Sequence, residues 1–209
     1  AVPHVKALKA FLARPELADL RVRPIIVSDS KMVTPEAVFA CHDNQLFYLG
    51  SVEQDDGVEE LIRSVSDEEL RAHELSYRPQ RQRRQGEPFI PYRGVLRPIT
   101  FKLDDQIVTD RALVVWSAGK AQLDSQKGKT YLKRLLNGLA RIQGWMGKRS
   151  YTNRDYIVRC LDGVQRGNPA RQWVDVEITT AEDGRLGLKF WVNRERLAAA
   201  RALEGKYVL

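Results

Sequence analysis

An aspartate that directly follows a short apolar run is the residue of this sequence best placed to do chemistry. Residues 25–27 (Ile-Ile-Val) form the run, Ser28 and Asp29 follow it, and Thr34 to Glu36 mark the start of a helix. A continuous apolar run predicts a strand buried on both faces, and ligands of open α/β sheets gather at the carboxyl ends of such strands. A carboxylate there suits a hard cation such as Mg²⁺. The alternative is that Asp29 only caps a turn or the next helix.

Composition sets the class of protein. The chain has 209 residues, of which 43% are hydrophobic and 29% charged, which predicts one large or two small globular domains with a real core. No apolar run approaches the ~20 residues that a bilayer requires, and no signal peptide is visible, so we expect no membrane partner. Cys41 and Cys160 match no metal-binding spacing, and this cysteine usage favours a reducing, cytoplasmic setting.

Positive charge is concentrated in two stretches. The chain carries 34 Lys and Arg against 27 Asp and Glu, a net charge of +7. Residues 127–171 alone hold eleven Lys and Arg, opposed only by Asp155 and Asp162. A second basic stretch, opposed only by Glu87, contains Arg78, Arg81, Arg83, Arg84, Arg93 and Arg97. Clustered positive charge is typical of a polyanion partner, usually nucleic acid; the alternative is a pair of solvated basic faces.

The first 52 residues are expected to form half of an α/β layer. Helical spacing of apolar residues predicts a helix over 3–19, residues 22–28 form the buried strand, and Thr34 caps a helix that ends near His42. A second strand covers 46–52. Alternating helices and strands indicate an α/β arrangement.

The rest of the chain reads as a mixed α and β region. Residues 55–57 (Asp-Asp-Gly) indicate a turn, and Ser66 caps a helix with Glu69 in the capping-box position. Two antiparallel strands are expected on either side of Asp104-Asp105. A long helix is expected over 119–148, followed by a second basic helix that Thr152 caps.

A β-hairpin near the carboxyl end has a register that can be predicted. The apolar positions of 174–178 and 186–192 fall on one face only if the loop has three residues, 182–184, with Gly184 left-handed. That loop pairs Ile178 with Leu188. Trp173 and Trp191 then lie on the polar side, where they could stack on bases; the alternative is that another layer covers them.

Together these motifs resemble the DDE transposases of bacterial insertion sequences, in the group with a long insertion before the last catalytic residue. The resemblance rests on the order of several motifs rather than on any one of them. They are the strand and aspartate of 27–33, the strand 46–49, the run 139–151 with Gly147-Lys148-Arg149-Ser150-Tyr151, the hairpin 174–191 and the final residues 202–209. One departure is that Ser30-Lys31 stand where a basic residue and a glycine are expected.

The resemblance implies a fold, a reaction and a set of site residues. The fold is α/β (α+β overall): a partial ribonuclease H-like core over 1–52, followed over 53–209 by an insertion domain with a basic helical hairpin and antiparallel strands, returning to the core at the carboxyl end. Asp29 would be the second of three carboxylates that hold two divalent metals, Mg or Mn, for attack on DNA phosphodiesters. The other two carboxylates would lie before Ala1 and after Leu209, so this segment alone would not cleave DNA.

The implied partners are transposon-end and target DNA, and the resemblance leaves room for a homodimer in a synaptic complex on the bacterial nucleoid. The residues expected to contact DNA are Arg81, Arg83, Arg84, Lys148, Arg149, Arg154, Trp173 and Trp191. Two other readings remain open, namely a non-catalytic nucleic-acid-binding module and an interaction domain for an acidic protein.

Overall fold

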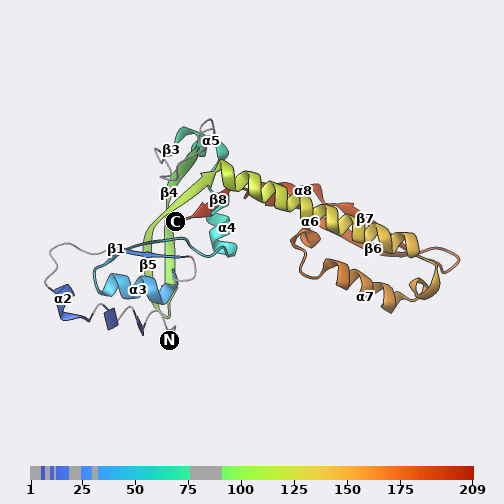
Figure 1. Cartoon of the computed structure of the whole chain (residues 1–209), viewed down its shortest axis with the longest axis horizontal. Helices are drawn as coiled ribbons and strands as arrows, with labels where there is room; N and C mark the ends of the chain where they lie inside the picture. The colour runs from blue at the N-terminus through green and yellow to red at the C-terminus, as the bar shows by residue number, and fades with distance from the viewer. Residues whose placement is uncertain (1–5, 8–9, 12, 19–24, 30–32, 76–90) are drawn as a thin grey trace, which may run out of the picture. The chain divides into compact units, whose positions relative to one another are not determined.

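The protein has a mixed α+β fold, shown as a computed structural model in Figure 1. The structure describes residues 6–7, 10–11, 13–18, 25–29, 33–75 and 91–209. Within them, no helix is both long and apolar enough to cross a bilayer.

By compactness the chain forms two units: unit 1 comprises residues 1–119 and 205–209, and unit 2 comprises residues 120–204. The division by function that the sequence predicts falls instead after residue 52, between a partial catalytic core and an insertion domain. That division stays a prediction. Unit 1 contains, in chain order, α2 (Pro15–Ala18), β1 (Ile25–Ser28), α3 (Pro35–Asp43), β2 (Phe47–Gly50), α4 (Asp56–Arg63), α5 (Asp67–Ala72), β3 (Glu74–Leu75), β4 (Tyr92–Leu103), β5 (Gln106–Ser117) and β8 (Lys206–Val208). Unit 2 contains most of α6 (Ala118–Trp145), the 3₁₀ helix η1 (Arg149–Thr152), α7 (Arg154–Gln165), the 3₁₀ helix η2 (Pro169–Trp173), β6 (Val174–Thr180), β7 (Leu186–Val192) and α8 (Arg194–Arg201).

A strand–helix–strand unit opens unit 1. β1 and β2 pair in parallel and α3 connects them, as the sequence predicts. Thr34 caps α3, because its Oγ1 accepts a hydrogen bond from the Ala37 amide at 3.4 Å, and Pro35 occupies the first turn, where it forfeits no helical hydrogen bond. The expected single helix over 3–19 is wrong, since Ala13 is in a turn and α2 begins anew at Pro15.

The prediction that β1 is buried on both faces is also wrong. Ile25 and Val27 are 63% and 75% exposed. Their register partners on β2, Phe47 and Leu49, are 55% and 51% exposed. The physical reason is that β1 belongs to a sheet of two strands, and no described element covers this face.

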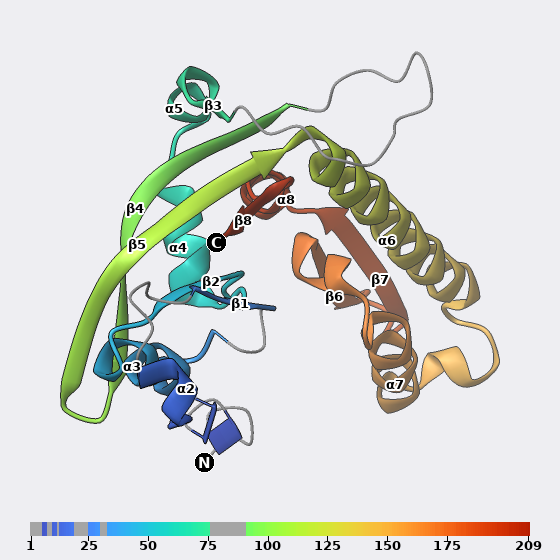
Figure 2. The same ribbon diagram turned by 60° about the vertical axis from the view of Figure 1, so that its left-hand side comes forward.

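A four-stranded antiparallel sheet in the order β3-β4-β5-β8 forms the other part of unit 1. β4 and β5 make a long curved hairpin with α3 and α4 along its concave side (Figure 2). The turn is at Asp104-Asp105, as predicted. α3 reaches this sheet through Val38 and Phe39, which pack with Phe101 of β4 in an apolar cluster.

Two helices of unit 1, α4 and α5, begin at residues whose side chains cap the helix. Ser66 caps α5 as predicted, its Oγ accepting from the Glu69 amide at 3.1 Å. The expected turn over 55–57 is instead the start of α4, because the Asp55 carboxylate accepts from the Val58 amide at 2.8 Å and acts as an N-cap.

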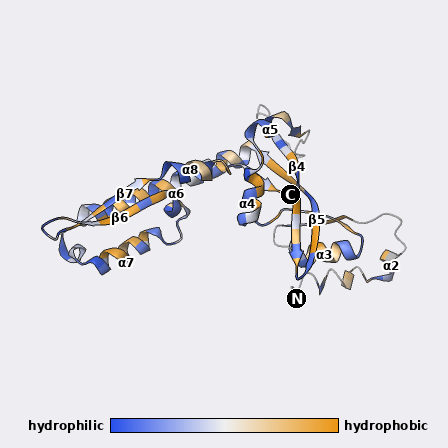
Figure 3. Ribbon diagram, turned by 180° about the vertical axis from the view of Figure 1, so that it is seen from behind, coloured by the Kyte–Doolittle hydropathy of each residue, from blue (hydrophilic) through white to orange (hydrophobic). Residues whose placement is uncertain are grey.

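Unit 2 is a helical hairpin packed with a β-hairpin. α6 and α7 contribute Leu135, Leu139, Ile142 and Ile157 to a core that β6 and β7 complete. Apolar and polar stretches alternate along these elements in Figure 3. The expected cap of α7 at Thr152 is wrong by one residue: Asn153 Oδ1 accepts from the Tyr156 amide at 3.0 Å, while Thr152 ends η1.

The predicted register of the β-hairpin is confirmed. Ile178 pairs with Leu188, Ala181 N donates to Arg185 O at 2.8 Å, and Gly184 has a φ of 79°. The loop therefore has three residues with a left-handed glycine at its end.

Candidate functional site

Asp29 lies at the carboxyl end of β1, immediately after Ser28, and is exposed. The neighbouring strand approaches this point closely. A Cβ added to Gly50 would lie 2.6 Å from Ser28 Oγ and 2.9 Å from Ser28 O, so only glycine fits without displacing the backbone. The ends of β1 and β2 therefore lie close together just before Asp29. The expected neighbours Ser30 and Lys31 lie outside the described residues.

The residues described around Asp29 do not make a metal centre by themselves. Within the described part of the chain, no group of three or more His, Cys, Asp or Glu side chains could hold a metal ion. A site for two divalent metals needs several carboxylates, because both the attacking and the leaving oxygen require a cation. Asp29 therefore offers one ligand, and no metal-dependent step can be derived from the geometry of these residues.

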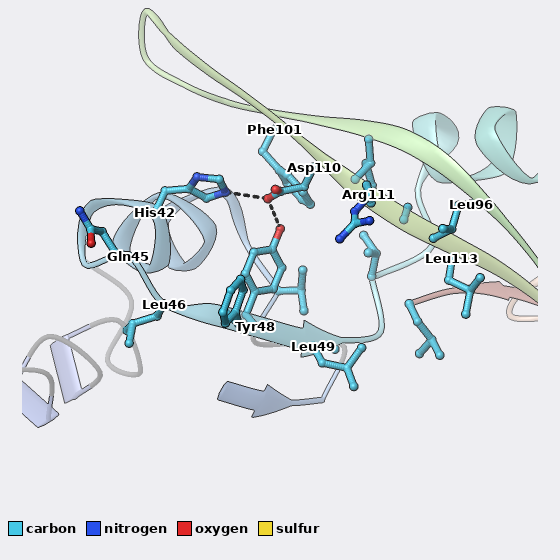
Figure 4. Close-up of a pocket in the computed structure, with 17 residues that line it drawn as sticks. His42, Gln45, Leu46, Tyr48, Leu49, Leu96, Phe101, Asp110, Arg111 and Leu113 are labelled. Atoms are coloured by element: carbon cyan, nitrogen blue, oxygen red, sulfur yellow. Dashed lines mark hydrogen bonds and ion pairs between the residues drawn. The ribbon is translucent and has the colours of Figure 1, made fainter. Parts of the chain in front are cut away.

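A second polar site lies in a cavity of about 610 Å³ between β2 and the β4–β5 hairpin. His42 and Tyr48 both point toward the carboxylate of Asp110 (Figure 4). The Tyr48 hydroxyl donates to Asp110 Oδ2 at 2.6 Å, and His42 Nε2 lies 2.8 Å from the same oxygen. Most of the remaining lining is apolar, and Arg111 also borders the cavity.

The chemistry of this site fits structural hydrogen bonds between elements better than a catalytic centre. Burial, reinforced by the hydrogen bond to Asp110, raises the pKa of Tyr48 well above its ordinary value, so the phenol stays protonated. Burial and then the nearby charge of Asp110 raise the pKa of the Cys41 thiol. Cys41 is 2% exposed, so it is an inert core thiol rather than a nucleophile. Asp110 thus ties α3 and β2 to β5.

Sequence reasoning missed this cluster, although one signal was available. Val108, Asp110, Ala112 and Val114 alternate along β5 on the side that becomes buried toward its end. A carboxylate in such a row needs polar partners. Its partners lie 62 and 68 residues earlier in the chain, which no local pattern reveals.

The predicted DNA-contacting residues that the structure describes all belong to unit 2. Lys148 and Arg149 both lie over the exposed ring of Trp145, each 5.8 Å from its centroid. Arg154 is exposed in the first turn of α7, where a cation is unfavourable for the helix dipole. Lys148 Nζ also donates to Gly144 O at 3.2 Å, and none of these contacts neutralises the three positive charges. Arg81, Arg83 and Arg84 lie outside the described residues.

Trp173 and Trp191, the two tryptophans of the hairpin region, differ in their exposure to solvent. Trp191 is 49% exposed and pairs with Asp175 across the strands. Trp173 does not lie on a strand: it ends η2 and packs against the apolar core. Its ring lies in van der Waals range of a Cβ placed at Gly128 of α6, at 3.6 Å. The prediction that Trp173 occupies the polar side of the hairpin is wrong, because the strand alternation on which it depended begins only at Val174.

Asp29 thus belongs to unit 1 together with the basic stretch that ends at Arg97, whereas the basic helices belong to unit 2. Comparisons with protein-family models, with curated proteins and with solved structures found no match for this chain. Its residues, their geometry and their charge are what can support a function.

Proposed function

We propose that this chain is part of a DDE transposase, an enzyme that cleaves and transfers DNA strands at the ends of an insertion sequence. The observation that carries the proposal is the parallel β1–α3–β2 unit with Asp29 directly after β1. Parallel strands joined by a helix present ligand-binding residues at their carboxyl ends. Such an enzyme would work in the bacterial cytoplasm on nucleoid DNA.

The exposed face of the small sheet supports a larger catalytic core. Four large apolar side chains, Ile25, Val27, Phe47 and Leu49, stand in register on it. Parallel sheets are normally covered on both faces. In the proposal, this is the face against which further elements of a ribonuclease H-like core would pack.

The metals of the proposal are Mg²⁺ or Mn²⁺, which prefer carboxylate oxygens. Asp29 would be one ligand, and the other carboxylates would come from outside these 209 residues. Bound metals would supply charge stabilisation to the attacking and leaving oxygens. Unit 2 would contribute binding of DNA phosphates through its basic helices.

A second candidate is a nucleic-acid-binding module without catalysis. It is favoured by the basic segment 127–171, and by the finding that no group of three or more His, Cys, Asp or Glu among the described residues could hold a metal ion. In that case Asp29 would only end a strand.

Substitution of Asp29 in the complete protein separates the two candidates. We expect Asp29→Asn to lower cleavage of a plasmid carrying the element's ends by about a thousandfold or more, because a metal ligand contributes several kcal/mol to the transition state. DNA binding should persist. Asp105→Asn, at the exposed turn between β4 and β5, is the matched control and should cleave normally. Cleavage retained by Asp29→Asn would eliminate the transposase proposal and leave the binding module.

A further inference from the structure

Unit 2 contains a groove of about 600 Å³ between α6 and the end of α7. Three arginines line it: Arg134 and Arg141 from α6, and Arg166 from the end of α7. The described lining residues include Asn137 but no Asp or Glu. A groove with this lining suits an anion with several oxygens, because guanidinium groups bind phosphate and carboxylate in a bidentate manner.

The groove is a fixed feature of the packing between the two helices. A Cβ at Gly138 would lie 2.5 Å from Val164 Cγ1, so this glycine allows α6 and α7 to approach closely. At the end of the groove Asn168 is 8% exposed. Its Nδ2 donates to Tyr131 O at 3.1 Å, and its Oδ1 accepts from the Ala170 amide at 3.0 Å. These contacts hold the segment after α7 against α6.

The open part of the groove lies beside these contacts. A Cβ at Gly163 would meet nothing within 4 Å, and the same holds at Gly167, which has a φ of 68°. An anion could therefore approach the backbone there without displacing a side chain.

The arginines of α6 continue a regular basic stripe. Lys127, Arg134 and Arg141 recur every seven residues, which places them on one face of the helix with a drift of only about 20° per step. Successive members are about 10.5 Å apart along the axis. That distance is close to three base-pair steps along the axis of a duplex, at about 3.4 Å each.

The charges of the groove are available. Within the described residues, no ion pair of Arg134 or Arg141 is found. Arg166 pairs with Asp162 at 2.8 Å, but both side chains are mostly exposed, at 79% and 64%. Such a surface pair contributes little, so a phosphate can replace the carboxylate.

We propose that this groove, with Arg134, Arg141 and Arg166, holds the sugar–phosphate backbone of a nucleic-acid strand that continues along the stripe toward Lys127. The inference rests on the proposed function in that DNA is the polyanion. It adds a specific binding site that differs from the residues near Trp145.

The test compares two double variants of the 209-residue chain with the same change in charge. Arg134→Gln with Arg141→Gln removes two groove cations. Lys129→Gln with Lys133→Gln removes two exposed cations of the same helix that do not line the groove. Binding to a generic 20-base-pair DNA duplex is followed by fluorescence anisotropy over a series of KCl concentrations, and circular dichroism checks that both variants keep their helix content.

We expect the groove variant to bind DNA about a hundredfold more weakly, since it loses two charge-assisted contacts that are each worth about a factor of ten. The slope of log K against log[KCl] should fall by about 2, at about 0.9 per phosphate contact. The lysine variant should keep a slope near that of the unaltered chain.

Three outcomes would overturn the proposal that the groove binds DNA. Equal losses in both variants would mean that general positive charge binds the DNA, and the transposase proposal would be untouched. Groove-dependent binding of poly-glutamate without binding of DNA would make the partner an acidic protein. Absence of DNA binding by the unaltered chain at low salt would remove both the groove and the DNA-contacting role of unit 2. The Asp29→Asn cleavage assay stays independent of all three.

Discussion

The two units of this chain differ in how they use their apolar side chains. Unit 2 has a closed apolar core: Leu135, Leu139 and Ile157 are fully buried where the helical hairpin meets the β-hairpin. Unit 1 leaves an apolar face of β1 and β2 exposed and joins these elements to the antiparallel sheet through a small apolar cluster and the carboxylate of Asp110. Unit 1 also buries apolar side chains, among them Ile62, Val114 and Val208. Packing therefore holds both units together, and in unit 1 the polar contacts of Asp110 add to it.

The largest effect is expected from the core of unit 2. Leu139→Ala should lower the free energy of unfolding by about 2–5 kcal/mol, because it removes a fully buried side chain and leaves a cavity. Leu123→Ala on the same helix is the control; Leu123 is 57% exposed, and we expect a change within about 0.5 kcal/mol. Urea denaturation measures both, and hydrogen exchange should localise the loss to residues 120–204. Similar costs for the two leucines would show that unit 2 lacks the closed core described above.

A smaller effect is expected from the polar contacts of unit 1. Tyr48→Phe removes a hydrogen bond to Asp110 and should cost about 1–2 kcal/mol, because His42 is then the side-chain partner that the described residues leave to this partly buried carboxylate. Faster hydrogen exchange should appear in β2 and β5. Tyr131→Phe, at an exposed tyrosine of unit 2, should change neither. If both phenylalanine variants behave alike, Asp110 does not hold the parts of unit 1 together.

The same contacts predict that unit 1 loses stability at alkaline pH. Burial raises the folded-state pKa of Cys41 above 9.0 and that of Tyr48 above 10.0. A raised pKa means that the neutral form is favoured by folding, so its stabilising contribution is complete below the unfolded value and is lost as pH rises through the folded one. Urea midpoints should therefore fall as pH rises above about 9. Tyr48→Phe should flatten this fall, and an unchanged profile in that variant would contradict the assignment.

Local rules predicted much of unit 2 from the sequence. The alternation of β6 and β7 with one left-handed glycine was sufficient to set the register of the hairpin, since a slip by one residue would turn the apolar face outward. Leu135, Leu139 and Ile142 of α6 likewise recur at helical spacing, and all three are buried. In both cases the determining residues are close together in the chain.

Sequence reasoning was less successful where contacts between residues far apart in the chain determine burial or hydrogen bonding. In the sequence, Trp173 continues the alternation of apolar and polar residues of β6. In the structure it ends the 3₁₀ helix η2, which places it against α6. The apolar run of β1 indicated burial on both faces, yet burial depends on how many strands and helices lie alongside it. The role of Asp110 became evident only from its contacts with His42 and Tyr48. Asp29 could be placed at a strand end from the sequence, whereas its role as a metal ligand stays a prediction.

The smallest effects separate two glycines of α6 that the sequence cannot distinguish. Gly144→Ala should stabilise unit 2 by about 0.4–1 kcal/mol, because alanine favours the helix and a Cβ there meets nothing within 4 Å. Gly138→Ala gains the same helix propensity, but its Cβ would lie 2.5 Å from Val164 Cγ1. The β-branched valine has little freedom to move away, and overpacking costs about 1–3 kcal/mol. The two substitutions should therefore shift the urea midpoint in opposite directions, and a gain of stability at both sites would mean that α6 and α7 do not approach closely at Gly138.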